Sequence, residues 1–140
     1  MASSGFTMKF SINSGLGPRH GVPQWRVHFE QCREGIELFN RARFFEAHEA
    51  LEDVWRAAPQ PEKKFLQGLI QVAVALYHHG NGNRAGARSV LRRAFRNISL
   101  YPDGYGGIQS ATLLSSITEW QRALDHGTVA PALPRIVASE

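Results

Sequence analysis

The chain has 140 residues, of which 43% are hydrophobic and 20% are charged, with 16 Lys and Arg against 12 Asp and Glu. This length suits one compact domain and leaves no room for a second independent one. The sequence contains no apolar run of the roughly 18 residues that a membrane span needs, and its first twenty residues lack the apolar segment of a signal peptide. A single cysteine excludes an internal disulfide and a thiolate metal cage, so we expect a soluble, cytoplasmic protein.

Residues 1–21 are rich in Ser, Gly and Asn without a sustained period, which predicts a flexible leader. A helical domain over residues 22–127 is expected to follow. Its first helix begins near Pro23, and its apolar residues alternate at spacings of four and three: Trp25, Phe29, Cys32, Ile36 and Phe39. Because Cys32 lies on this stripe, we expect a buried and inert thiol.

A second, shorter helix is opened by Asn40-Arg41-Ala42 and has its inward stripe at Phe44, His48, Leu51 and Trp55. Two prolines, at positions 59 and 61, predict its end at Ala57–Ala58.

A third helix, from Pro61 to His79, is apolar over more than half of its circumference, which is typical of a central helix. Asn83 is the expected N-cap of a fourth helix. The inner face of that helix is predicted to contain Ala87, Val90, Leu91, Ala94, Phe95 and Ile98.

The segment Tyr101–Gly107 predicts a turn-rich loop, and a fifth helix from Gln109 to Asp125 is ended by Gly127. Residues 128–140 contain two prolines and predict an extended C-terminal tail that packs over the bundle. Since alternation of period two never persists, the predicted fold class is all-α. We expect a single compact bundle of five main helices with one central helix.

The sequence also predicts tetratricopeptide-like helical hairpins. Asn40-Arg41-Ala42 is echoed by Asn83-Arg84-Ala85, forty-three residues later. The first hairpin has small and aromatic residues at offsets that suit two crossing helices: Gly35, Phe39, Phe44, Ala47 and Leu51. Such hairpins are expected to pack on each other, because one alone cannot cover its apolar face.

Polar side chains are predicted to meet inside the bundle. His48 and Glu52, four residues apart, share the apolar face of the second helix, and Gln67, Gln71 and His78 follow on the third at spacings of four and seven. Antiparallel packing of the two helices would join them in one inward cluster. Two uses stay open: internal hydrogen bonding, which we favour, and a site for a small ligand or a divalent metal with His48, Glu52 and His78 as ligands.

Arginines recur every fourth residue on the fourth helix and predict a basic stripe: Arg84, Arg88, Arg92 and Arg96. We expect this stripe to face solvent or to pair with the acidic second helix. Nucleic acid is disfavoured as a partner, since the pattern shows no recognisable module and no exposed aromatic residues between the arginines.

Linked motifs give the sequence a family resemblance. These are Phe39-Asn40, the run from Phe44 to Trp55 with His48-Glu49 and Glu52, Phe65-Leu66-Gln67-Gly68-Leu69-Ile70-Gln71, His78, and Gly82-Asn83 with Gly86-Ala87. Over about residues 25–125 the chain resembles the bacterial and archaeal family called domain of unknown function 309. The resemblance implies a compact helical domain with a central helix and no established activity. It places the distinctive polar residues of the family at His48, Glu49, Glu52, Gln67, Gln71 and His78.

Two hypotheses for function follow. The preferred one is a non-enzymatic module whose hairpins present a groove to a protein or peptide, with self-association through leftover apolar surface as a further expectation. The alternative is a metal-binding or small-ligand-binding protein, hydrolases included, that uses the inward cluster. The sequence names no cofactor beyond that divalent metal, and it leans towards a role without catalysis.

Overall fold

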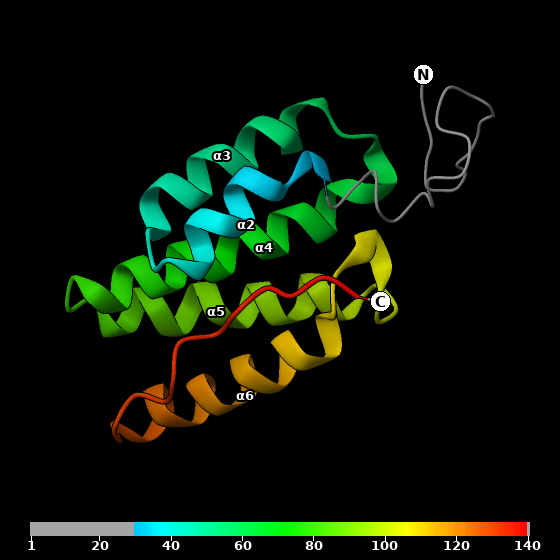
Figure 1. Ribbon diagram of the computed structural model, residues 1–140. Helices are drawn as coiled ribbons and strands as arrows, with labels where there is room; N and C mark the ends of the chain where they lie inside the picture. The colour runs from blue at the N-terminus through cyan, green and yellow to red at the C-terminus, as the bar shows by residue number, and fades with distance from the viewer. Residues whose placement is uncertain (1–29, 140) are drawn as a thin grey trace, which may run out of the picture.

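The structure is a computed structural model that describes residues 30–139 (Figure 1). Its elements are, in order, α2 (Arg33–Asn40), α3 (Phe44–Ala57), α4 (Gln60–Gly80), α5 (Arg84–Ser99), the short 3₁₀ helix η1 (Tyr105–Gly107) and α6 (Ser110–His126). The predicted all-α class is confirmed. Across the described residues, strand-like pairing is limited to one isolated bridge between Ile108 and Ala138. The expected leader, and Trp25 and Phe29 of the first predicted helix, lie outside the described residues.

Short turns join α2 to α3, α3 to α4 and α4 to α5, whereas residues 100–109, which include η1, connect α5 to α6. Consecutive helices pack side by side, with α2 and α3 along one side of the bundle and α6 along the other (Figure 1). The central helix is α4, which packs on both α3 and α5, while α5 packs on α6. Ten residues of α4 are buried: Glu62, Phe65, Leu66, Gly68, Leu69, Ile70, Val72, Ala73, Ala75 and Leu76. Between residues 30 and 139, none of the helices is both long and apolar enough to cross a membrane.

The predicted stop signals mark the observed helix ends. α3 ends at Ala57, because Ala58 and Pro59 are extended. The side chain of Asn83 accepts a 2.9 Å hydrogen bond from the backbone N–H of Gly86 and caps α5. Gly127 adopts the left-handed conformation, with φ of 67°, immediately after α6.

The α2–α3 and α4–α5 turns share one backbone geometry. The N–H of Arg43 donates to the carbonyl of Leu38 at 2.9 Å, and the N–H of Asn83 donates to the carbonyl of His78 at 2.8 Å. In each turn the residue before the donor has a positive φ. The two helical hairpins are therefore related by forty residues (43 to 83) and not by the forty-three that the Asn-Arg-Ala strings predict. Asn40 belongs to the end of α2, whereas Asn83 caps α5, so the strings are not equivalent.

The shared turn predicts the effect of exchanging its central residues. Ala42 has φ of 63° where the second hairpin has Gly82 at 78°. Ala42→Gly removes backbone strain of about 1–2 kcal/mol from the folded state. It also costs about 0.4–1 kcal/mol, because glycine gives the unfolded chain more conformational entropy. We therefore expect the free energy of unfolding to rise by about 0.5–1 kcal/mol. Urea unfolding measures this difference. Gly82→Ala is the reciprocal control and is expected to destabilise, although its new Cβ meets nothing within 4 Å.

One predicted core position is wrong. Phe95 is expected on the inner face of α5, yet it is 38% exposed. The buried face of α5 is narrow and consists of Ala87, Leu91, Ala94 and Ile98. Phe95 lies one residue beyond Ala94, about 100° further round the helix, and therefore leaves the core.

The segment after Gly127 runs extended across the bundle and ties α6 to α2 (Figure 1). Asn40 holds it at Ile136 by two hydrogen bonds: its Nδ2 donates to the carbonyl of Ile136 and its Oδ1 accepts from the N–H of Ile136, both at 2.9 Å. The Nε1 of Trp120 donates to the carbonyl of Ala132 at 2.9 Å. Ile136 is buried, so this segment, which we call the tail, completes the core.

Candidate functional site

The predicted inward cluster does not form inside the bundle. The side chains of His48 and Glu52 are 21% and 40% exposed, and His48 Nε2 lies 3.9 Å from Glu52 Oε2. Glu49 and Gln67 are exposed. The reason is that only Ala47 and Leu51 of α3 are fully buried, so the buried face of this helix is narrow and His48 lies at its margin.

The remaining members of the predicted cluster contact α5 and its capping turn. Gln71 Oε1 accepts a 2.9 Å hydrogen bond from Asn97 Nδ2, and His78 Nδ1 lies 3.4 Å from Asn83 Nδ2. Residues 30–139 contain no group of three or more His, Cys, Asp or Glu side chains arranged to hold a metal ion. The predicted ligand set of His48, Glu52 and His78 therefore finds no support in the described part of the chain.

Aromatic rings do gather on the surface where α3 meets the end of α4. The ring centroids of Phe45 and Tyr77 are 5.4 Å apart, and those of Phe45 and His48 are 5.1 Å apart. Tyr77 continues to His78, with centroids 6.4 Å apart. Phe45 is 46% exposed and Tyr77 is 41% exposed. We call these four residues the aromatic patch, and it includes both histidines that carry the family resemblance, His48 and His78.

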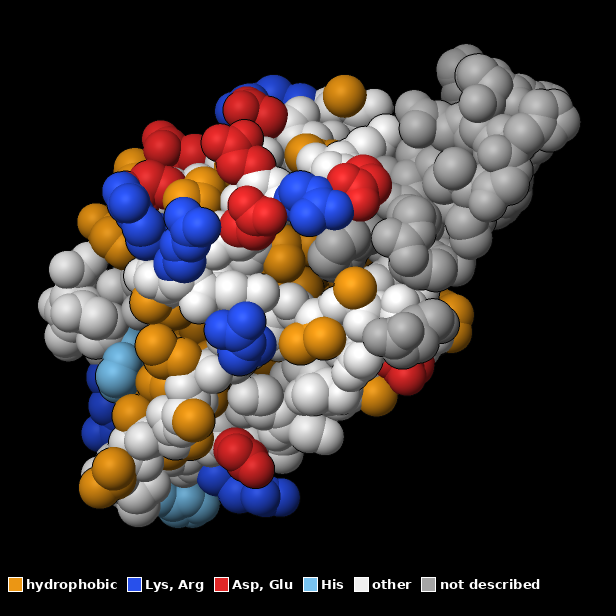
Figure 2. Space-filling view, in the orientation of Figure 1, with side chains coloured by type: hydrophobic (Ala, Val, Ile, Leu, Met, Phe, Trp, Pro, Cys, Tyr) orange, Lys and Arg blue, Asp and Glu red, His pale blue; other side chains and the backbone are white. Residues whose placement is uncertain are grey.

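A hollow of about 560 Å³ adjoins the aromatic patch. It lies where the α2–α3 turn, the end of α4 and the tail meet, and Figure 2 shows apolar side chains collected at this end of the molecule. Its apolar and aromatic lining comes from Ala42, Phe44, Phe45, Leu76, Tyr77, His79 and Leu133. Its volume falls within the range of about 300–1,000 Å³ that is usual for ligand pockets.

Acidic side chains border the aromatic patch. α3 carries Glu46, Glu49, Glu52 and Asp53, and Figure 2 shows acidic side chains gathered over the α2 and α3 side of the molecule. A hydrogen bond from Arg43 at 2.8 Å holds the pKa of Glu46 below its usual range. Arg56 pairs with Glu52 at 3.6 Å and with Asp53 at 2.6 Å. Glu49 is exposed and has no ion pair among the described residues, so its charge faces solvent.

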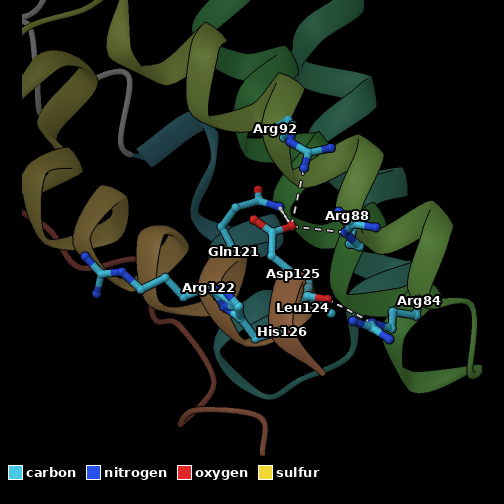
Figure 3. Close-up of polar contacts among 8 residues, drawn as sticks. All are labelled: Arg84, Arg88, Arg92, Gln121, Arg122, Leu124, Asp125 and His126. Carbon is cyan, nitrogen blue, oxygen red and sulfur yellow. Dashed lines mark hydrogen bonds and ion pairs between the residues drawn. The ribbon is translucent and has the colours of Figure 1, made fainter. Parts of the chain in front are cut away.

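The predicted basic stripe faces α6 and not the acidic second predicted helix (Figure 3). Arg84 Nε donates to the carbonyl of Leu124 at 2.8 Å. Arg88 Nε and Arg92 Nη2 reach one oxygen of Asp125 at 3.0 and 3.3 Å. Arg96, the last member, has no ion pair in the part of the chain that the structure describes. The sequence missed the partner, because α6 has only two separated acids, Glu119 and Asp125, and no acidic run.

Part of this chain is similar in sequence to known proteins. Residues 32–90 match the model of the family described as Domain of unknown function (DUF309). Over these residues the chain is similar to the DUF309 family. It is 40% identical over 62 residues to Uncharacterized protein YpuF of Bacillus subtilis (strain 168), a match that covers 44% of this chain and 36% of that protein. It is also 32% identical over 91 residues to an uncharacterized protein of Aquifex aeolicus (strain VF5), which covers 64% of this chain and 27% of that protein. The chain thus spans well under half the length of either relative.

The DUF309 match includes the whole aromatic patch but only part of the hollow and of the basic stripe. The aromatic patch, with His48 and His78, lies within residues 32–90. Asp125, Arg92, Arg96 and Leu133 lie beyond it. One wall of the hollow, half of the basic stripe and its acidic partner therefore lie outside the matched segment.

The ion pairs of Asp125 predict a pH dependence of stability. Hydrogen bonding from Arg88, assisted by Gln121 and the charge of Arg92, lowers the pKa of the Asp125 carboxyl. Because the folded-state pKa lies below the unfolded value, this stabilisation is complete above a pH of about 4 and is lost as the pH falls further. We expect Asp125→Asn to unfold more readily than the wild type at neutral pH, and the difference to shrink below about pH 4. Thermal melts from about pH 2.5 to about pH 7 measure it, and a difference that stays constant over this range would contradict the assignment.

Other candidate residues serve packing. Cys32 is buried, and burial together with the charge of Glu62 raises the pKa of its thiol to about 12, as expected for an inert cysteine. His79 packs edge-on against Trp120, with ring centroids 4.9 Å apart. The sequence analysis did not single out Phe45 of the aromatic patch or Leu133 of the hollow. The available signal for Phe45 was that a large aromatic residue lies outside the predicted inward stripe of its helix, which indicates an exposed ring.

Proposed function

We propose that this protein is a non-enzymatic interaction module that binds a short protein segment on the aromatic patch and in the adjoining hollow. The observation that carries the proposal is the contact between Phe45 and Tyr77, whose rings pack on each other while each stays more than 40% exposed. Exposed apolar groups that gather beside a hollow are characteristic of interaction sites, because burying them on a partner is favourable.

The surroundings favour a partner of particular chemistry. The hollow offers apolar and aromatic walls, with Leu133 from the tail 49% exposed on one side of it. The neighbouring helix α3 carries more acids than bases, and Glu49 lacks an ion pair among the described residues. We therefore expect the partner segment to place an aromatic or large aliphatic side chain in the hollow and a Lys or Arg beside Glu49.

Selection from a random peptide library displayed on phage, against the full chain, tests the proposal directly. Selected peptides are synthesised and their affinities are measured by calorimetry. We expect them to combine a large apolar residue with a nearby Lys or Arg. Phe45→Ala and Tyr77→Ala should each weaken binding about tenfold or more, which corresponds to about 1.4 kcal/mol.

Phe95→Ala provides the matched control, since Phe95 is similarly exposed but lies on α5 away from the hollow. It should change peptide affinity less than twofold. Equal losses for Phe45→Ala and Phe95→Ala, or a library that yields no binder, would overturn the proposal. A change of sedimentation coefficient in Phe45→Ala would assign the aromatic patch to self-association instead.

A further inference from the structure

The basic stripe of α5, which we call the arginine row, consists of Arg84, Arg88, Arg92 and Arg96. It differs from an ordinary solvated surface in its charge balance and its contacts. α5 has five arginines and no acid, and α6 adds Arg122 against Glu119 and Asp125. Only Asp125 forms ion pairs with the row among the described residues. Most of the positive charge on this flank is therefore not neutralised within the described chain.

The bonds to α6 also orient the row (Figure 3). Arg84 and Arg88 use the inner nitrogen, Nε, for the bonds to Leu124 and Asp125. The two terminal nitrogens of each guanidinium keep their N–H groups for another acceptor. Guanidinium groups that are already held in place lose little freedom when they bind a phosphate, and their forked donors suit it.

The spacing of the row matches an extended polyanion. Four arginines from Arg84 to Arg96 follow one another at intervals of four residues, each step rising about 6 Å, so that the row is about 18 Å long. It winds gradually from the side that faces α6 towards solvent, since four residues overshoot one helical turn by about 40°. A row of this length suits successive phosphates along one strand better than a single anion.

Phe95 provides an aromatic ring on the same flank. It follows Arg92 by three residues and Arg88 by seven, which places the three side chains on one face of α5. The ring is 38% exposed, although the sequence pattern assigns it to the core. An exposed aromatic ring beside phosphate-binding arginines is the combination that binds single strands, because bases stack on the ring.

We infer that the flank formed by α5 and the end of α6 binds single-stranded nucleic acid through its phosphates, with Phe95 as a stacking platform. The arginines and Phe95 carry this inference, and neither contributes to the aromatic patch, so the inference is independent of the proposed function. An acidic protein segment fits the flank less well, because it offers no bases for Phe95 and its carboxylates lack the regular spacing of a phosphate chain.

Fluorescence anisotropy of a labelled single strand of about 20 nucleotides, titrated with the full chain at about 50 and about 200 mM salt, tests the inference. Replacing both Arg92 and Arg96 by alanine should weaken binding about tenfold, and the slope of log affinity against log salt should fall by about 1.4 as two phosphate contacts are lost. Phe95→Ala should weaken binding of the single strand about fivefold and leave binding of a duplex nearly unchanged.

The matched control replaces Arg43 and Arg56 by alanine, which removes the same charge from α3 and its N-cap position. This double variant and Phe45→Ala should each change affinity less than threefold, and circular dichroism melts verify that every variant is folded. The inference is overturned if the single strand does not bind at the lower salt concentration, or if both double arginine variants lose affinity equally. It is also overturned if polyglutamate of similar length competes as well as the unlabelled strand, since an acidic protein would then be the better partner.

Discussion

Replacing Trp120 by alanine is expected to lower the free energy of unfolding by about 3–5 kcal/mol. Trp120 is 2% exposed, so its loss leaves a large cavity between α6 and its neighbours. Its Nε1 also provides the hydrogen bond to Ala132 that holds the tail, and its ring is the one on which His79 packs. We expect the tail to detach before the helices unfold, because both its anchor and part of its supporting surface disappear.

Urea unfolding and limited proteolysis separate these two consequences. Trp120→Phe retains most of the buried ring but loses the hydrogen bond, so it should destabilise much less than Trp120→Ala and still expose the tail to protease. Because Leu133 lines the hollow from the tail, both variants should also bind selected peptides less tightly. A Trp120→Ala protein with wild-type stability would refute the packing of α6 and the tail described above.

Replacing Gly68 by alanine should destabilise by about 2 kcal/mol or more, despite the better helix propensity of alanine. A Cβ at Gly68 would lie 2.6 Å from Ile98 Cγ1 and 3.2 Å from the backbone nitrogen of Ile98. The side chain of Ile98 is fully buried, and the backbone of α5 cannot move away without disturbing the core. Gly68 thus sets the close approach of α4 and α5.

Gly80→Ala is the control for this prediction. Gly80 is the last residue of the same helix, and a Cβ built there meets nothing within 4 Å. Its substitution should leave the urea midpoint unchanged or raise it slightly. Equal destabilisation by the two substitutions would show that helix α4 itself, and not its contact with α5, is sensitive. The additional exchange Ile98→Ala should show strong coupling with Gly68→Ala in a double-mutant cycle.

Local signals in the sequence were sufficient for the helices. Pro59, Asn83 and Gly127 act on the backbone of their own neighbours, so the structure begins and ends its helices close to the predicted positions. The forty-residue relation between the hairpins was harder to find. It rests on turn geometry, and the positive φ of Ala42 leaves no glycine as a signal.

The candidate site was less predictable, because spacing fixes which side chains share a face and not which face is buried. The sequence pattern predicts that Phe44, His48 and Trp55 all point inward. In the structure the fully buried residues of α3 are Ala47 and Leu51, while Phe44 and Trp55 are only partly buried beside them. The polar residues that carry the family resemblance consequently lie on or near the surface. The pairing of the arginine row with Asp125 likewise depends on the tertiary packing of α5 against α6, which no local pattern in the sequence indicates.

We propose that this protein binds a protein segment on the outer surface of α3 and the end of α4. The most direct test is a proton–nitrogen correlation spectrum of the isotope-labelled full chain, recorded during titration with a selected peptide. We expect shift changes concentrated at Phe45, His48, Tyr77 and His78, extending to Leu133 of the tail. Changes concentrated on α5 and α6 instead, with the resonances of α3 unmoved, would contradict the proposal.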